Sequence, residues 1–177
     1  MKTQNTYYII YQTGFRPNRS TIDNIFIIRQ IYEKCHEHSI VLHNIFVDSM
    51  QAFDSVNRPM IPECLKQYKV PRKLIKLVQA TLHRTRVKVK INNDMTEQSE
   101  ITSGVKQGDP LSALLFSIVM DVIISKVEAR GNISTRLKQI SAYADDIIII
   151  GRTKQVKMDT FTELKCEESK FGLLTLR

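Results

Sequence analysis

The chain has 177 residues, of which 42% are hydrophobic, enough for the buried core of one domain or of a domain with a small lobe. It contains no Gly/Ser linker and no run of about 18 apolar residues, so we expect no contact with a membrane. The net charge is +8, and ten Lys/Arg residues against one acid give the segment from Arg58 to Lys90 a charge of +9. Such a segment would attract a polyanion such as nucleic acid, although a solvated helix face beside a lysine-protected edge strand has the same pattern.

The three cysteines, Cys35, Cys64 and Cys166, are far apart in the chain and form no CxxC or His/Cys cluster. We therefore expect no zinc site. Free thiols favour a reducing compartment, which predicts an intracellular protein of the nucleus or cytoplasm.

The first predicted elements are a helix and a strand. The residues 20–23 have the pattern of a capping box, and they predict a helix over residues 21–35. Residues 40–47 are mostly apolar and β-branched, and they predict a buried strand that ends at Asp48. In the helix, the residues at helical spacing are Ile22, Ile25, Phe26, Arg29 and Tyr32.

Prolines begin the next two predicted helices, one from Pro59 and Pro62 to about residue 68 and one from Pro71 to about residue 82. A hairpin follows, because residues 86–91 alternate basic and apolar side chains and a turn at residues 92–94 leads into a strand near residues 97–101. We expect residues 86–91 to bury one face. In the second helix we expect three inward side chains, Leu74, Leu77 and Val78.

The second half of the chain contains the longest predicted helix, with Asp109 as its N-cap and Pro110 at its first position. Gly131 ends or follows this helix. Two short strands, at residues 139–143 and 147–150, come next, and a last helix runs over residues 157–170. Mixed helices and strands with hairpins predict an α+β fold, in which helices cover one face of an antiparallel sheet.

Carboxylates stand where predicted strands end. Asp145 and Asp146 lie between two apolar strands, and Asp48 ends another. Neighbouring carboxylates repel each other, and a hard divalent cation with oxygen ligands removes that repulsion. Each aspartate would also suit an ordinary turn or cap. If the two strands are neighbours, the three carboxylates converge and two ions about 4 Å apart could bridge a hydroxyl and a phosphate.

Two loops precede predicted helices. Residues 104–110 contain two glycines, which allow a backbone to approach a flat ligand closely, although a loop also needs glycine for its turns. Residues 14–20 place Arg16 and Arg19 beside a helix N-terminus, which suits a triphosphate or a nucleic-acid backbone, but also a basic loop with a cap.

Together and in this order, these segments resemble the reverse transcriptases of non-LTR (LINE-type) retrotransposons over most of the chain. Residues 14–20 resemble the first fingers motif, and residues 46–54 (Phe-Val-Asp-Ser-Met-Gln-Ala-Phe-Asp) resemble motif A. Residues 104–111 resemble motif B, and residues 142–146 (Ala-Tyr-Ala-Asp-Asp) resemble motif C. The resemblance implies a right-hand polymerase, with fingers at about 1–40 and 58–105 and palm at about 41–57 and 106–177.

The resemblance implies an RNA-directed DNA polymerase that adds dNTPs to a DNA primer on an RNA template with two Mg²⁺ ions, for which Mn²⁺ is the implied substitute. Asp48, Asp145 and Asp146 would be catalytic metal ligands, with the backbone carbonyl of Ser49. Phe53 would exclude a 2′-hydroxyl. The remaining contacts would be Gln107, Gly108, Arg16 and Arg19 with the nucleotide, and Lys73, Lys76, Arg84, Arg86 and Lys88 with nucleic acid.

The chain departs from the family pattern at Ser49, Gln51 and Ala113, where the family often has a large apolar residue, Lys and Pro. We expect a fragment without thumb or endonuclease, weakly active or inactive. Two alternatives remain open: a non-catalytic nucleic-acid-binding remnant of a decayed element, and a group II intron maturase-type reverse transcriptase.

Overall fold

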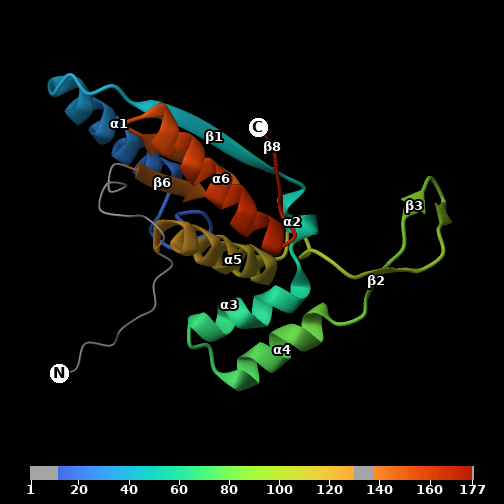
Figure 1. The fold of residues 1–177 in the computed structure, drawn as a ribbon. Helices are drawn as coiled ribbons and strands as arrows, with labels where there is room; N and C mark the ends of the chain where they lie inside the picture. The colour runs from blue at the N-terminus through green and yellow to red at the C-terminus, as the bar shows by residue number, and fades with distance from the viewer. Residues whose placement is uncertain (1–11, 130–137, 177) are drawn as a thin grey trace.

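A four-stranded antiparallel sheet lies at the centre of the computed structural model, which describes residues 12–129 and 138–176. The strand order is β6-β7-β1-β8, so β1, from the first third of the chain, pairs on one side with β7 of the β6–β7 hairpin and on the other side with β8 (Figure 1). The strands are β1 (His43–Met50), β6 (Lys138–Tyr143), β7 (Asp146–Gly151) and β8 (Leu174–Leu176).

Helices α5 (Pro110–Ala129) and α6 (Lys154–Lys170) pack on one face of this sheet. Val47 and Ile147 from the sheet, Phe116 from α5 and Leu164 from α6 are buried together in the core. Asp109 caps α5 as predicted, since its Oδ1 accepts from the N–H of Leu111 at 3.0 Å. The antiparallel sheet and the helices on this face confirm the predicted α+β fold.

Helix α5 is also the one helix among the described residues that is long and apolar enough to cross a membrane, by length and composition. The segment concerned is Pro110–Val127, and 67% of it is buried inside the fold. Its apolar side chains therefore serve as the centre of the core.

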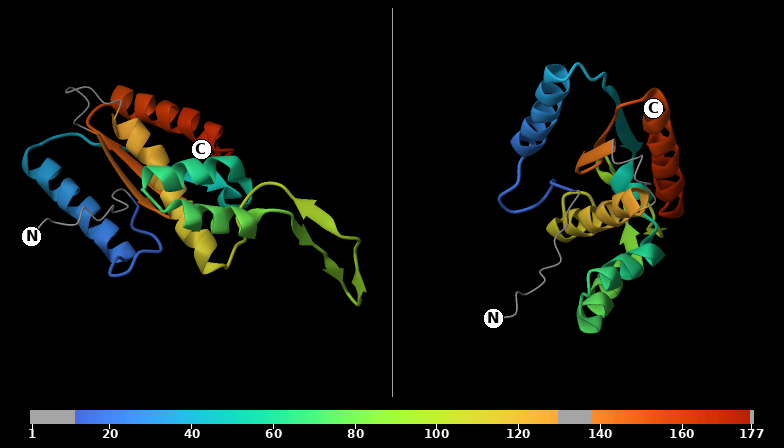
Figure 2. Two further views of the ribbon diagram at one scale, coloured as in Figure 1. Left: turned by 90° about the horizontal axis from the view of Figure 1, so that it is seen from below. Right: turned by 60° about the vertical axis from the view of Figure 1, so that its left-hand side comes forward.

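Helix α1 (Thr21–Glu37) lies on the opposite side of the sheet from α6 (Figure 2). The predicted capping box is present, because the backbone N–H of Ser20 donates to Oδ2 of Asp23 at 2.8 Å. The buried residue of the helix is Asn24. Four of the apolar residues at helical spacing are instead exposed: Ile22, Ile25, Phe26 and Tyr32.

Strand β1 differs from its prediction in where it ends and in its burial. It does not end at Asp48, because Asp48, Ser49 and Met50 pair with Leu176, Thr175 and Leu174 of β8. It is also not buried on both faces. Val47 and Ser49 are buried, whereas Phe46 is 73% exposed, so the second half of the strand has one covered and one open face.

Between β1 and the long helix, the chain forms α2 (Ala52–Ser55), the 3₁₀ turn η1 (Arg58–Met60), α3 (Ile61–Gln67) and α4 (Arg72–Leu82). The helices that begin near Pro59 and Pro71 were predicted. Of the three inward side chains predicted on α4, Val78 is confirmed and two are wrong. Leu74 and Leu77 are 50% and 55% exposed, whereas Ile75 is buried and Val78 packs against the core.

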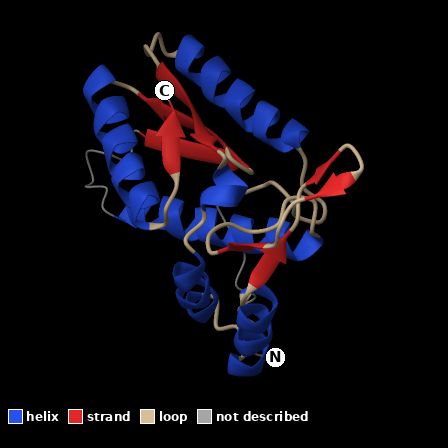
Figure 3. Cartoon of the chain, turned by 90° about the vertical axis from the view of Figure 1, so that its right-hand side faces the viewer, coloured by secondary structure: helices blue, strands red, loops and turns tan. Residues whose placement is uncertain are grey.

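The predicted hairpin is present as an arm that projects from the body of the molecule (Figure 1), and Figure 3 views the molecule from the side of this arm. Its base pairs β2 (Thr85–Val87) with β5 (Ser99–Ile101), and its tip pairs β3 (Lys90–Ile91) with β4 (Asp94–Met95). The predicted buried face was wrong, because Val89 and Ile91 are 56% and 60% exposed. Gly131 lies outside the described residues.

Candidate active site

Asp48 and Asp146 lie across from each other on neighbouring strands. The register pairs Val47 with Ile147, and one further step places Asp48 opposite Asp146. Val47 and Ile147 are each 2% exposed on the core side. Since successive side chains alternate between faces, both aspartates project from the face that α5 and α6 do not cover.

A cavity of about 400 Å³ lies on this open face, between the sheet and α1. Asp48 and Asp146 line one part of it, and Phe46, Tyr143 and Ile148 supply apolar surface. On the other side it is bounded by Asn24 and Ile28 of α1. The two carboxylates therefore face a space that is large enough for part of a ligand.

Asp145 occupies the two-residue turn between β6 and β7, directly before Asp146. Burial, and then the negative charges of Asp145 and Asp48, raise the pKa of the Asp146 carboxyl above its ordinary value. The three carboxylates thus interact electrostatically, and a cation would relieve their repulsion. Asp146 is therefore within electrostatic reach of both Asp48 and Asp145, and the role of the three acids as metal ligands stays a prediction.

In residues 12–129 and 138–176, no group of three or more His, Cys, Asp or Glu side chains is arranged so that it could hold a metal ion. Mg²⁺ is usually bound by one or two carboxylates, together with water and substrate phosphates. The donor chemistry of Asp48, Asp145 and Asp146 fits such a partly open site. The predicted separation of 4–6 Å between the side chains of Asp48 and Asp145 stays a prediction.

Phe53 lies at the end of motif A and contacts two other aromatic rings. Its ring stacks on Phe116 with centroids 4.4 Å apart, and it meets Phe15 edge to face at 6.2 Å. Phe53 is partly buried against the core. One ring face is thus covered by Phe116, and whether the other selects sugars stays a prediction.

The loop of motif B is fixed to the segment that follows motif A. The N–H of Val105 donates to the carbonyl of Phe53 at 2.7 Å, and the N–H of Gly104 donates to the carbonyl of Val56 at 2.8 Å. A Cβ on Gly104 would lie 2.4 Å from the Asp54 carbonyl oxygen, so this glycine serves packing rather than ligand approach. Gly108 has open space at that position.

Gln107 and Gly108 are both exposed, and Arg19 is exposed on the loop before α1. Arg16 is half-buried, and its Nη1 donates to the carbonyl of Gln12 at 3.3 Å. The positive charge of Arg16 lowers the pKa of Tyr68. Burial of Tyr68 and its hydrogen bond to Asp121 outweigh this effect, so the pKa of Tyr68 is raised. Arg16 is therefore held beside the α3–α5 contact, and its predicted role at a triphosphate stays a prediction.

The basic segment divides into a structural and a surface part. Arg58 donates to three backbone carbonyls, of Gly104 and Leu82 at 2.7 Å and of Ile101 at 2.8 Å. Burial lowers the pKa of its guanidinium. Arg58 therefore joins α4, the arm and motif B, and this arginine fits the structural alternative to nucleic-acid contact.

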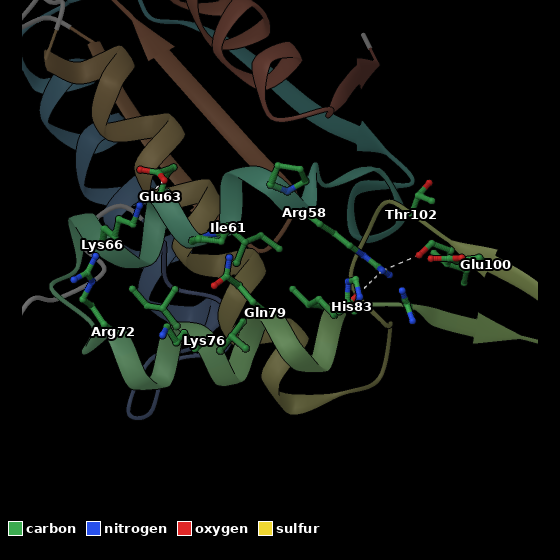
Figure 4. A pocket seen from close by; sticks show the side chains of 17 residues that line it. Arg58, Ile61, Glu63, Lys66, Arg72, Lys76, Gln79, His83, Glu100 and Thr102 are labelled. Atoms are coloured by element: carbon green, nitrogen blue, oxygen red, sulfur yellow. Dashed lines mark hydrogen bonds and ion pairs between the residues drawn. The ribbon is translucent and has the colours of Figure 1, made fainter.

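The other basic side chains are on the surface. A groove of about 670 Å³ between α3, α4 and β5 is lined by Lys66, Arg72, Lys76 and Arg84, with Glu63 and Glu100 among them (Figure 4). Each of the five predicted nucleic-acid contacts is exposed, on α4 or the arm: Lys73, Lys76, Arg84, Arg86 and Lys88.

Two buried residues, Ser49 and Gln12, make contacts next to the aspartates that the sequence did not predict. Ser49 is buried, and its hydroxyl donates to Oε1 of the fully buried Glu168 on α6 at 3.4 Å. This contact explains how a serine is accommodated where the family often has a large apolar residue. The second residue is Gln12, which is fully buried beside the turn of Asp145.

The open face, the paired strands and the acidic turn are those of the palm of a nucleic-acid polymerase. The family model described as reverse transcriptase (RNA-dependent DNA polymerase) matches residues 4–174. The chain belongs to this reverse transcriptase family, and the family prediction from its motifs is confirmed.

Retrotransposon proteins are among its relatives. It is 29% identical over 153 residues to a retrovirus-related Pol polyprotein from the type-2 retrotransposable element R2DM of Drosophila melanogaster. The aligned residues cover 84% of this chain and 14% of that polyprotein. A Pol polyprotein from a type-1 retrotransposable element R2 of Nasonia vitripennis is 25% identical over 134 residues, 75% of this chain and 13% of the relative. The chain thus spans a small part of these relatives.

A solved structure of telomerase from Candida albicans, in complex with a fragment of telomeric RNA, has a similar fold. The TM-score is 0.72 at 11% identity, over 93% of this chain and 31% of the telomerase. At this identity the likeness concerns the fold alone, and it agrees with the predicted fingers and palm. The division of the chain into interleaved fingers and palm parts stays a prediction.

Proposed function

We propose that the chain is the fingers and palm part of a retrotransposon RNA-directed DNA polymerase. It would add dNTPs to the 3′ hydroxyl of a DNA primer on an RNA template. The observation that carries this proposal is the placement of Asp48 and Asp146 across two antiparallel strands, with Asp145 in the adjoining turn, on the open face of the sheet.

Divalent ions, Mg²⁺ with Mn²⁺ as a substitute, would be held by Asp48, Asp145, Asp146 and the backbone carbonyl of Ser49. When bound, a pair of such ions activates the attacking hydroxyl and neutralises charge on the phosphate. The carboxylates contribute by holding oxygen donors on a rigid sheet, since β1 and β7 are paired along five successive residues up to the site.

Other residues would orient the substrates. Phe53 would lie under the sugar of the nucleotide, supported by Phe116. Gln107 and Gly108 would lie against the nucleotide and the template base, since both are exposed on the loop before α5. Arg16 and Arg19 would act on the triphosphate or the template, and the exposed cations of α4 and the arm would contact nucleic-acid backbone.

The proposal is tested by single-nucleotide primer extension on an RNA template, with the chain in excess over the primer and Mg²⁺ or Mn²⁺ present. Excess protein compensates for weak primer binding, because loss of positioning alone can remove several kcal/mol of catalysis. We expect slow, metal-dependent addition of one dNTP that the Asp145→Asn substitution abolishes and that Asp94→Asn, on the exposed arm, leaves unchanged.

Equal addition by the wild-type and Asp145→Asn chains would contradict the proposal. So would addition that persists when EDTA removes divalent ions. Salt-sensitive RNA binding without any addition, even at high protein excess, would favour the alternative of a non-catalytic nucleic-acid-binding remnant.

A further inference from the structure

Gln12 makes an unusual set of contacts that the proposed chemistry does not use. Its side chain is 0% exposed, and its amide contacts both backbone groups of Ala144, a residue 132 positions away. Nε2 donates to the Ala144 carbonyl at 2.8 Å, and Oε1 accepts from the Ala144 N–H at 2.8 Å. Oε1 also accepts from the N–H of Gly14 at 2.8 Å.

The backbone around Gln12 is laid against the edge of the sheet at the same place. Gln12 forms an isolated parallel bridge with Ala142, and the N–H of Thr13 donates to the Ala142 carbonyl at 3.0 Å. A Cβ on Gly14 would lie 2.5 Å from the nitrogen of Ala144, so a larger residue would push this segment away. Residues 12–14 and the end of β6 are therefore held in one arrangement.

The Ala144 backbone needs such support. Its φ is 56°, in the left-handed region that residues with a Cβ rarely adopt. It lies in the tight turn between β6 and β7, in which Tyr143 pairs with Asp146. Ala144 is 7% exposed, so its N–H and carbonyl would lack compensating partners without the Gln12 amide.

The next two residues along the chain are Asp145 and Asp146. Because the peptide group between Ala144 and Asp145 carries the carbonyl that Gln12 holds, rotation of that group would redirect the Asp145 backbone. We propose that Gln12 is a positioning residue, whose amide fixes the left-handed turn and thereby sets where the carboxylates of Asp145 and Asp146 project. The inference rests on the proposed function, since it concerns how well those carboxylates hold a divalent ion.

The test measures two properties in Gln12→Met and Gln12→Asn chains. Methionine keeps the side-chain length without any of the three hydrogen bonds, and asparagine keeps the amide but is too short to reach both groups of Ala144. The first measurement is the affinity for Mn²⁺, by calorimetric titration. The second is the hydrogen-exchange rate of the Ala144 amide, by NMR.

Outer residues that orient metal ligands typically change metal affinity by about 10- to 100-fold. We expect Mn²⁺ affinity to fall by about tenfold or more in both variants, and the Ala144 amide to exchange faster. Two controls separate this from general destabilisation. Ile75→Ala removes a buried side chain of α4, and Gln67→Met changes an exposed glutamine of α3. Both should keep the wild-type Mn²⁺ affinity below their melting temperatures.

An Asp145→Asn chain distinguishes failure of this inference from failure of the proposed function. If Asp145→Asn abolishes Mn²⁺ binding while folded Gln12→Met and Gln12→Asn chains bind as wild type does, Gln12 has no positioning role. If Asp145→Asn binds Mn²⁺ normally, the proposed metal centre itself is wrong. If Gln12→Met does not fold, Gln12→Asn, which retains a polar group in the buried position, decides the matter by the same two measurements.

Discussion

The ring of Phe53 stacks on the ring of Phe116, with centroids 4.4 Å apart and 19° between the ring planes. This contact joins the end of motif A to the first half of α5, where Phe116 is fully buried. Phe53 therefore contributes to the core as well as standing next to the candidate site.

Replacement of Phe53 by alanine should lower the free energy of unfolding by about 2–4 kcal/mol, because stacking and buried apolar contact are both lost. Urea denaturation measures the loss. Phe46→Ala is the matched control, since Phe46 is 73% exposed and should change stability by no more than about 0.5 kcal/mol. A loss no larger than that of the control would contradict the core role of Phe53.

Sugar selection by Phe53 needs a separate measurement, made with the chain that performs single-nucleotide addition. If the ring excludes a 2′-hydroxyl, Phe53→Ala should raise ribonucleotide incorporation relative to deoxyribonucleotide incorporation. Phe53→Tyr, which keeps the bulk, should not. An unchanged ratio in Phe53→Ala would leave Phe53 as a core residue only.

Arg58→Lys should destabilise the chain although it conserves the charge. The guanidinium spans three carbonyls from three segments, and a lysine ammonium cannot match that geometry. We expect a loss of about 2 kcal/mol in the free energy of unfolding, as hydrogen bonds of a charged group are broken. Arg86→Lys on the exposed arm is the control. Equal losses of stability in the two variants would contradict the conclusion that Arg58 joins α4, the arm and motif B.

The salt dependence of RNA binding should identify which cations contact nucleic acid. Neutralising Arg84, Arg86 and Lys88 together as glutamines should reduce the slope of log affinity against log salt by about two to three, because fewer counterions are released. The charge-matched control neutralises three exposed cations elsewhere: Arg152, Lys154 and Lys165. An equal change in slope for both triple variants would remove the specific role given to the arm.

The charge on Asp146 should lower the stability of the metal-free chain at neutral pH. Its folded-state pKa is raised, first by burial and then by Asp145 and Asp48, so its stabilising contribution is present at low pH and is lost as pH rises through that pKa. Asp146→Asn removes this penalty. In EDTA, the variant should therefore gain stability relative to wild type as pH rises from below the ordinary pKa of an aspartate through the raised pKa of Asp146.

The measurement is urea denaturation at several pH values, with Asp94→Asn on the arm as the control for loss of one negative charge. If the stability of Asp146→Asn relative to wild type falls as pH rises, the prediction that the Asp146 charge destabilises the metal-free chain is contradicted. Addition of Mn²⁺ should stabilise wild type more than Asp146→Asn, since ligand binding to the folded state stabilises it.

Local patterns predicted the long helix and the acidic hairpin well. Asp109 and Pro110 mark the start of α5 through capping alone, and the strands around Asp145 and Asp146 need only a turn between two apolar runs. The acids of motifs A and C were predicted from the ends of the predicted strands, although β1 continues past Asp48 to Met50. These features depend on residues that are close together in the sequence.

Features that depend on distant partners were missed. β8 has only three residues, and its pairing with Asp48 to Met50 cannot be read from its own composition. The inward face of α1 was ambiguous because isoleucines occur all around it, and tertiary contact decides that Asn24 faces the sheet. The role of Gln12 depends on a backbone group 132 positions away, so a single buried glutamine gives no local signal.

The most direct test of the metal centre is the location of bound Mn²⁺ by paramagnetic broadening of amide NMR signals. The account predicts the strongest broadening at Val47, Ser49 and Ile147, which surround Asp48 and Asp146, and little at residues 90–95 of the arm. The broadening should disappear in a folded Asp145→Asn chain. Broadening centred away from β1 and β7, or unchanged in Asp145→Asn, would contradict the account.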